Sequence, residues 1–189
     1  MFDPYQAASI ESSLVYKKKK KQKRAFKQAI VGMIVGVAGA YIANILNNLI
    51  EKKKFNEIFK VTSSWQIFYA SVVAGGINGV LVVYLPPKLY RFASVIVIAV
   101  LFEIINGISN NTYSTNYTFV SNIVRDIFLI FFIIDLYKKL FKDYTKNKKN
   151  DSIDEIEFDE LLGVTLLSSI VLNIGIVTTR TGINSILNL

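Results

Sequence analysis

Five long apolar stretches alternate with polar segments along the chain. They cover residues 28–50, 61–85, 92–108, 118–137 and 161–179. Each is close to the run of about 20 apolar residues that crosses the hydrocarbon core of a bilayer as a helix. Pro86-Pro87 ends the second stretch, because a proline inside a helix removes a backbone donor. The pattern predicts an all-α, polytopic membrane protein with about five transmembrane helices in a small bundle.

The polar segments divide the chain into four parts. These are a basic leader (1–27), a four-helix transmembrane region (28–139), a charged inner-side loop (140–160), and a fifth transmembrane helix with a short tail (161–189). The sequence Ala38-Gly39-Ala40 follows the basic leader and resembles a signal-peptide cleavage site. The apolar stretch continues well past this point, so we expect an uncleaved membrane anchor.

Lysine and arginine are distributed unevenly between the two sides that five spans would create. With the N-terminus inside, sixteen fall on that side and five on the other, with the cluster Lys52–Lys54 as the main exception. Because Lys and Arg in short loops stay on the cytoplasmic side, we expect the N-terminus there and the C-terminus opposite. The uncharged loop Ser109–Tyr117 then lies outside. Which membrane holds the protein is left open by the sequence.

The basic leader has two interpretations. The segment Lys17–Lys27 can fix the topology, which we favour, and it can also bind anionic lipid headgroups. We expect no nucleic-acid partner, because the run Lys17–Arg24 contains no aromatic residue on which bases could stack. The predicted partners are the lipid bilayer and either other membrane proteins or a second copy of the chain.

The amino-acid composition limits the kinds of binding and catalytic site that the chain can form. Of 189 residues, 52% are hydrophobic and 19% are charged, an apolar excess beyond what one soluble core of this length buries. The chain has no cysteine and no histidine, which excludes disulfides, thiol catalysis and most zinc, haem and iron–sulfur sites. No phosphate-binding glycine loop and no nucleophile with an evident base is visible, so we expect no cofactor, no metal and no catalytic residue.

Small residues recur every four positions in the first two apolar stretches. The rows are Gly32, Gly36 and Ala40, continued by Asn44 and Asn48, and Ser71, Gly75 and Gly79. In lipid, small residues let helix backbones approach closely, so each row predicts a packing face, either within the chain or toward a partner. The two stacked rows resemble those of the mitochondrial inner-membrane translocase family, a likeness that covers two helices and implies no particular role.

The fifth stretch carries a polar stripe at the same spacing, formed by Thr165, Ser169 and Asn173. Such a stripe must face protein or water, because lipid offers no hydrogen bonds. Hydrogen bonding between helices is the simpler interpretation, and a path for a solute is the alternative.

Three charged residues fall inside the third and fourth stretches. Glu103 and Arg125 lie at similar depths, roughly 10 Å below the same surface, and Asp126 follows directly. Because an unpaired charge in the hydrocarbon is costly, we expect Glu103 and Arg125 to be in contact. The site is either a structural ion pair or a proton, ion or headgroup site. The pattern from Glu103 to Asp126 resembles that of VanZ-type small membrane proteins but lacks the Asn and Gly that follow their second acid.

Three functions compete at this point. The first is a non-catalytic structural or assembly subunit of a larger membrane complex, suggested by the small-residue faces and the small extramembrane area. The second is a small transporter or channel that uses Glu103, Arg125 and Asp126. The third is an intramembrane enzyme with Glu103 and Asp126 as an acid–base pair, which requires a cavity around them.

Overall fold

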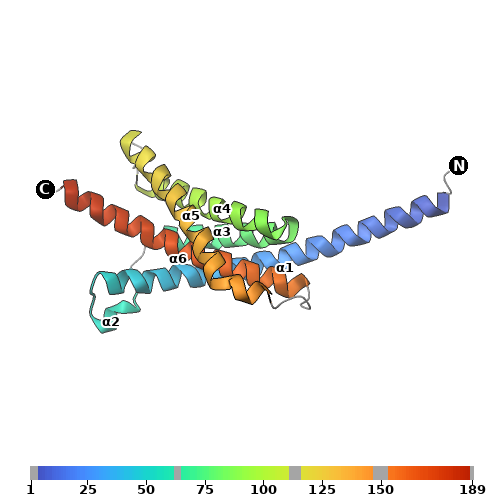
Figure 1. Ribbon diagram of the computed structural model, residues 1–189, viewed down its shortest axis with the longest axis horizontal. Coiled ribbons are helices and arrows are strands. Elements are labelled where there is room, and N and C mark those ends of the chain that lie inside the picture. The colour runs from blue at the N-terminus through green and yellow to red at the C-terminus, as the bar shows by residue number, and fades with distance from the viewer. Residues whose placement is uncertain (1–3, 62–64, 111–115, 147–152, 188–189) are drawn as a thin grey trace.

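The computed structural model is all-α, with 93% of residues in helices and no strand among those it describes. It describes residues 4–61, 65–110, 116–146 and 153–187, and their side chains over 13–61, 65, 68–104, 124–140 and 157–175. The helices are α1 (Pro4–Ile50), α2 (Phe55–Ile58), α3 (Trp65–Tyr84), α4 (Pro87–Asn110), α5 (Asn116–Lys146) and α6 (Ile153–Leu187). The all-α prediction is therefore confirmed (Figure 1).

The five long helices form one elongated bundle. The longest, α1, packs along α3 and α6, while α4 packs against α3 and α6, and α5 lies against α4 and α6. The N-terminal end of α1 and the C-terminal end of α6 extend to opposite ends of the molecule (Figure 1). The core comprises Tyr90, Ile98, Ile133, Leu161 and Leu172, each fully or almost fully buried.

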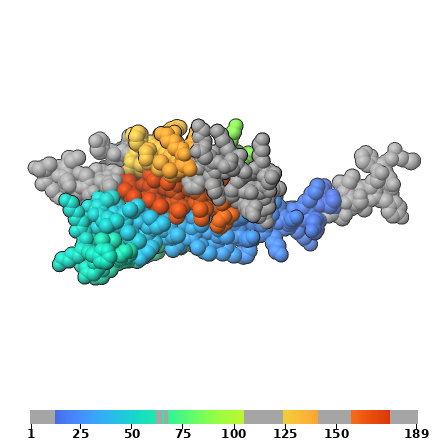
Figure 2. Space-filling model, turned by 60° about the horizontal axis from the view of Figure 1, so that its bottom comes forward, coloured from blue at the N-terminus to red at the C-terminus, as the bar shows by residue number. Residues whose placement is uncertain are grey.

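The basic leader is not a separate segment, because α1 begins at Pro4 and runs without a break through the first apolar stretch to Ile50. Side chains 13–23 are all exposed, and this part of α1 projects beyond the bundle (Figure 2). The lysines do not interrupt the helix, since lysine is a good helix former and these side chains are exposed.

The loop predicted over 140–160 is helical over most of its length. α5 continues to Lys146, and α6 already begins at Ile153; residues 147–152 lie outside the described residues. The acidic residues that open α6 suit this position, because carboxylates near a helix N-terminus interact favourably with its dipole. The charged segment between the fourth and fifth apolar stretches is therefore built largely from the ends of two helices.

Two described helical segments are long and apolar enough to cross a membrane, Ser13–Ile50 and Glu157–Gly175, and Phe68–Tyr84 is a shorter apolar helix. Charges interrupt the other two long helices: α4 carries Lys88, Arg91 and Glu103, and α5 carries Arg125, Asp126 and Asp135. The bundle of five spans is therefore not confirmed and stays a prediction.

Apolar and polar side chains are distributed in an unusual way. Among the large apolar side chains, Phe26, Trp65 and Phe128 are about 70% exposed, at 70%, 71% and 72%. By contrast, many amides and hydroxyls are completely buried: Asn44, Asn48, Ser71, Asn78, Ser94, Thr165, Ser168 and Ser169. A soluble protein of this size normally shows the opposite arrangement, in which large apolar groups are inside.

Candidate functional site

The small residues of α1 and α3 lie directly against each other. A Cβ atom on Gly32 would overlap the backbone carbonyl of Gly75, and one on Gly36 would overlap the carbonyl of Ser71. In the same way, a Cβ atom on Gly79 would lie 2.6 Å from the Cα of Ala29. Each step of four residues along α1 is thus matched by a step of four residues back along α3. Backbone-to-backbone contact of this kind is what rows of small residues permit in membrane helices.

Through these contacts, the rows of small residues on α1 and α3 pack against each other within the chain. Ser71 is fully buried, and Ala40 is 1% exposed. The rows therefore do not present a free face to a partner subunit. The same helix has a second small residue that the four-residue row does not contain: a Cβ atom on Gly39 would lie 2.6 Å from the Cβ of Ser169 on α6. Sequence reasoning considered Gly39 only in the context of signal-peptide cleavage.

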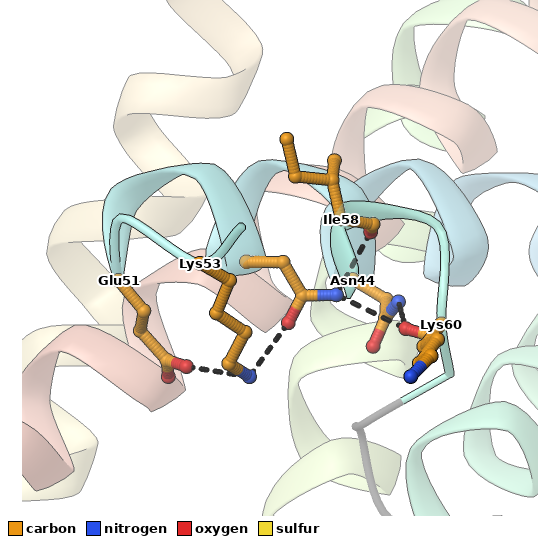
Figure 3. A network of polar contacts seen from close by, with 6 residues as sticks. Asn44, Glu51, Lys53, Ile58 and Lys60 are labelled. Carbon is orange, nitrogen blue, oxygen red and sulfur yellow. Dashed lines mark hydrogen bonds and ion pairs between the residues drawn. The ribbon is translucent and has the colours of Figure 1, made fainter. Parts of the chain in front are cut away.

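The two asparagines that continue the α1 row hold the segment after α2 in place (Figure 3). The Asn44 side chain donates to the carbonyl of Lys60 at 2.9 Å, and the Asn48 side chain donates to the carbonyls of Ile58 and Lys60 at 2.9 and 3.0 Å. Lys53 in turn donates to Asn48 Oδ1 at 2.8 Å. Carbonyls that the short helix leaves without partners are therefore satisfied by α1.

The polar stripe of α6 faces the interior of the bundle. Thr165 and Ser169 are fully buried, and Asn173 is 1% exposed. Asn78 of α3 donates to Thr165 Oγ1 at 3.3 Å, and the Asn173 side chain donates to the backbone carbonyl of Ser169 at 2.6 Å. The stripe therefore includes one hydrogen bond between helices, as its simpler interpretation requires.

Several buried polar atoms of α1, α3 and α6 form no hydrogen bond with described residues. They are Asn47 Oδ1, Asn78 Oδ1, Ser168 Oγ, Ser169 Oγ and Asn173 Oδ1. Leaving such a group without a partner costs free energy, about 1–3 kcal/mol each. We call this set of atoms, contributed by α1, α3 and α6, the polar seam.

Arg125 joins the charged residues of α4 and α5 into one group. Its Nη2 donates to Glu103 Oε1, and its Nε and Nη2 donate to Asp126 Oδ1 at 2.9 and 2.7 Å. The side chains of Arg125 and Asp126 are each 12% exposed, and that of Glu103 is 24% exposed. The structure thus brings together the two residues expected to be in contact, and Asp126 shares the guanidinium from the side.

A second group of charges lies at the opposite end of the bundle, where α6 begins. Arg24 of α1 pairs with Glu157, and Arg91 of α4 pairs with Glu160, with Nε at 2.9 Å from Oε2. The Glu157 and Glu160 side chains are only 10% and 7% exposed. The hydrogen bond to Glu160 raises the pKa of Arg91, which keeps the guanidinium charged.

Sequence reasoning missed this second group because it assigned both glutamates to a loop. A signal was present: Glu157 and Glu160 are three residues apart and directly precede an apolar stretch, so they share one face of a helix that continues into that stretch. Their partners are also two of only four arginines in a lysine-rich chain. Arginine is preferred for buried pairs because its guanidinium is less strongly hydrated than an ammonium group.

No family model matches the chain, and neither the curated proteins nor the solved structures contain a significant match. The partial resemblances to translocase and VanZ-type proteins therefore gain no support. Among the described side chains, no group of three or more acidic, histidine or cysteine residues is placed to hold a metal ion. Function must be argued from the geometry of the chain itself.

Proposed function

We propose that the chain is a multi-pass integral membrane protein with five spans, its N-terminus on the cytoplasmic side and its C-terminus opposite. The observation that supports this most strongly is the exposure of large aromatic and aliphatic side chains around a bundle with a polar interior. In a bilayer, exposed apolar side chains are solvated by lipid, while buried amides and hydroxyls hydrogen-bond between helices.

The alternation of the five spans is supported by contacts at one end of the bundle. Lys21 of α1 lies over the ring of Tyr84 at the end of α3, at 4.7 Å. Arg91, near the start of α4, lies 4.9 Å from the ring of Tyr137 in α5 and pairs with Glu160 at the start of α6. These contacts support an arrangement in which the predicted inner ends of the five spans lie at the same level. Helices that cross alternately in opposite directions are expected to meet in this way.

Within the membrane we propose a non-catalytic role as a structural or assembly subunit of a larger complex. The support comes from α5, which packs against α4 and α6 and leaves a row of aromatic side chains uncovered. Phe128, Phe131 and Phe132 are 72%, 61% and 48% exposed and line a groove with Val124 and Ile127. Large flat side chains beside a groove can receive the side chains of a partner helix, since association in lipid depends on close packing.

A small transporter or channel is the second candidate. It is supported by the group formed by Glu103, Arg125 and Asp126, in which one guanidinium faces two carboxylates, and by the unpartnered polar atoms of the polar seam. Charged residues inside membrane helices often belong to ion or proton pathways.

Purification in mild detergent followed by native mass measurement distinguishes the two roles. A fixed stoichiometric set of partner proteins is expected for a subunit, and Phe128→Ala with Phe131→Ala should release those partners. Tyr69→Ala is a matched control, because Tyr69 is similarly exposed, at 57%, but lies on α3. A monomer or small homo-oligomer without partners would contradict the subunit role and favour transport.

A further inference from the structure

We infer that the inner end of the bundle carries a binding surface for anionic lipid headgroups. We call it the lysine collar and define it as Lys17–Lys21, Lys23, Lys27, Lys88 and Lys138, from α1, α4 and α5. All of these side chains are exposed. The inference rests on the proposed position in a membrane and adds to it a class of ligand.

The level of the membrane surface can be read along α1. Exposed residues between Lys17 and Lys23 are nearly all lysine, while beyond them Phe26, Ile30 and Ile34 are exposed at 70%, 45% and 65%. The change from charged to apolar exposed side chains marks the border of the hydrocarbon. At 1.5 Å per residue, Lys17 lies roughly 13 Å beyond Phe26 along the helix. The lysines therefore occupy the headgroup layer and the water directly next to it.

The lysines point in every direction around α1. Consecutive residues of a helix are turned by about 100°, so the five residues Lys17–Lys21 cover the full circumference. A helix lying flat on a membrane has one charged face and one apolar face instead. Charge on all sides fits a helix that stands upright and is surrounded by headgroups.

The two buried glutamates described at this end do not neutralise the collar. Glu157 and Glu160 are turned inward and pair with Arg24 and Arg91. Among the described side chains, no collar lysine forms an ion pair; Lys21 lies over the ring of Tyr84. Arginine thus neutralises the buried carboxylates, and lysine supplies the exposed charge. The surface offered to lipid at this level is positive, and anionic phosphates are its natural ligands.

The opposite end of the molecule is different and provides an internal comparison. There Lys53 pairs with Glu51 at 2.7 Å and donates to Asn48. Glu57 lies in the same short segment, which gives a more balanced charge. Selection of anionic lipid is therefore expected at the inner end and not at the outer end.

The test measures which lipids contact each end of the protein in vesicles. The single tryptophan, Trp65, reports on the outer end, and Tyr84→Trp in a Trp65→Phe background reports on the inner end beside Lys21. Vesicles contain phosphatidylcholine and phosphatidylglycerol, one of them brominated so that it quenches a neighbouring indole. The ratio of quenching by the two lipids gives the preference for phosphatidylglycerol.

We expect a preference of about fivefold or more at the inner end and close to one at the outer end, since each lysine near an anionic surface contributes about a factor of five. Lys19→Gln with Lys20→Gln and Lys23→Gln should reduce the inner preference at least about fivefold. These changes keep four leader lysines, so orientation is preserved. The matched control, Lys52→Gln with Lys54→Gln and Lys60→Gln, should leave the preference unchanged. Salt at 1 M should weaken it, because it screens exposed charges.

Equal preference at both ends, or an inner preference that survives the three inner substitutions, overturns the inference. The inference is also overturned if inorganic phosphate displaces phosphatidylglycerol more strongly than sodium chloride does at equal ionic strength, because the ligand is then a free anion. Binding of single-stranded RNA through the same lysines, without lipid preference, overturns it as well. If brominated phosphatidylcholine quenches neither indole, the membrane position itself fails, which is a separate result.

Discussion

The backbone contact between α1 and α3 predicts that two neighbouring glycines of α3, Gly75 and Gly76, differ in how they tolerate a larger side chain. A Cβ atom on Gly75 would overlap the backbone carbonyl of Gly32, which cannot move unless the two helices separate. The nearest atoms to a Cβ atom on Gly76 would belong to the flexible side chain of Met33, with Cε at 3.0 Å and Cγ at 3.2 Å. Gly75→Ala and Gly76→Ala are therefore chemically identical changes, one residue apart on α3, with different consequences.

The expected magnitudes follow from two opposing effects. Replacing glycine by alanine inside a helix is favourable by roughly 0.5–1 kcal/mol, and this applies to both variants. Overpacking against a neighbour that cannot yield costs typically about 1–3 kcal/mol. The contacts at Gly32, Gly36 and Gly79 are shared along the same helix pair, so separation at Gly75 weakens all of them, and we expect the upper part of that range. Gly75→Ala should thus lower the free energy of unfolding by about 1–2 kcal/mol, and Gly76→Ala should leave it unchanged or raise it slightly.

The measurement is unfolding by increasing mole fraction of a denaturing detergent, followed by far-ultraviolet circular dichroism, for the parent and both variants. Gly75→Leu serves as a more severe form and should be less stable than Gly75→Ala. If Gly75→Ala is as stable as Gly76→Ala, the two helices are not in backbone contact at this point, and the reasoning is refuted.

Two further predictions concern topology and the charged group. In a chain without native cysteine, Lys54→Cys and Lys138→Cys should react with a membrane-impermeant label from opposite sides; reaction of both from one side contradicts the five-span arrangement. For the charged group, Arg125→Gln should cost more stability, about 3–5 kcal/mol, than Glu103→Gln, because it removes the guanidinium from two carboxylates, while Glu103→Gln leaves Arg125 paired with Asp126. Adding Glu103→Gln and Asp126→Asn to Arg125→Gln should restore much of that loss in the same unfolding assay, whereas a triple variant as unstable as Arg125→Gln alone would argue against charge burial as the cause.

That last prediction shows where the sequence was informative. Equal depth in two stretches joined by a short uncharged loop was enough to expect that Glu103 and Arg125 are in contact. It did not determine whether Asp126 would share Arg125 or face away. The structure shows sharing, so neutralising only Glu103 and Arg125 would remove the guanidinium from Asp126, and the rescue is expected to need all three substitutions.

Sequence periodicity determined which residues share a face of a helix. The four-residue rows on α1, α3 and α6 could be read directly, because the turn of a helix is a local property and side chains four residues apart always align. The pattern of apolar stretches likewise predicted the all-helical class, and the lack of cysteine excluded thiol chemistry. Periodicity within one helix could not show which neighbouring helix each face contacts.

The tertiary structure determined which residues of different helices are in contact. The two glycine rows face each other rather than another subunit, and Gly39 meets Ser169. Arg24 and Glu157 are separated by 133 residues, and Arg91 and Glu160 by 69, yet each pair closes the end of the bundle where α6 begins. Such pairs depend on how the five long helices pack together, because a buried charge needs a partner and the packing decides which residue lies beside it. The sequence alone therefore determined the faces of the helices, and the packing of the bundle determined the contacts between them.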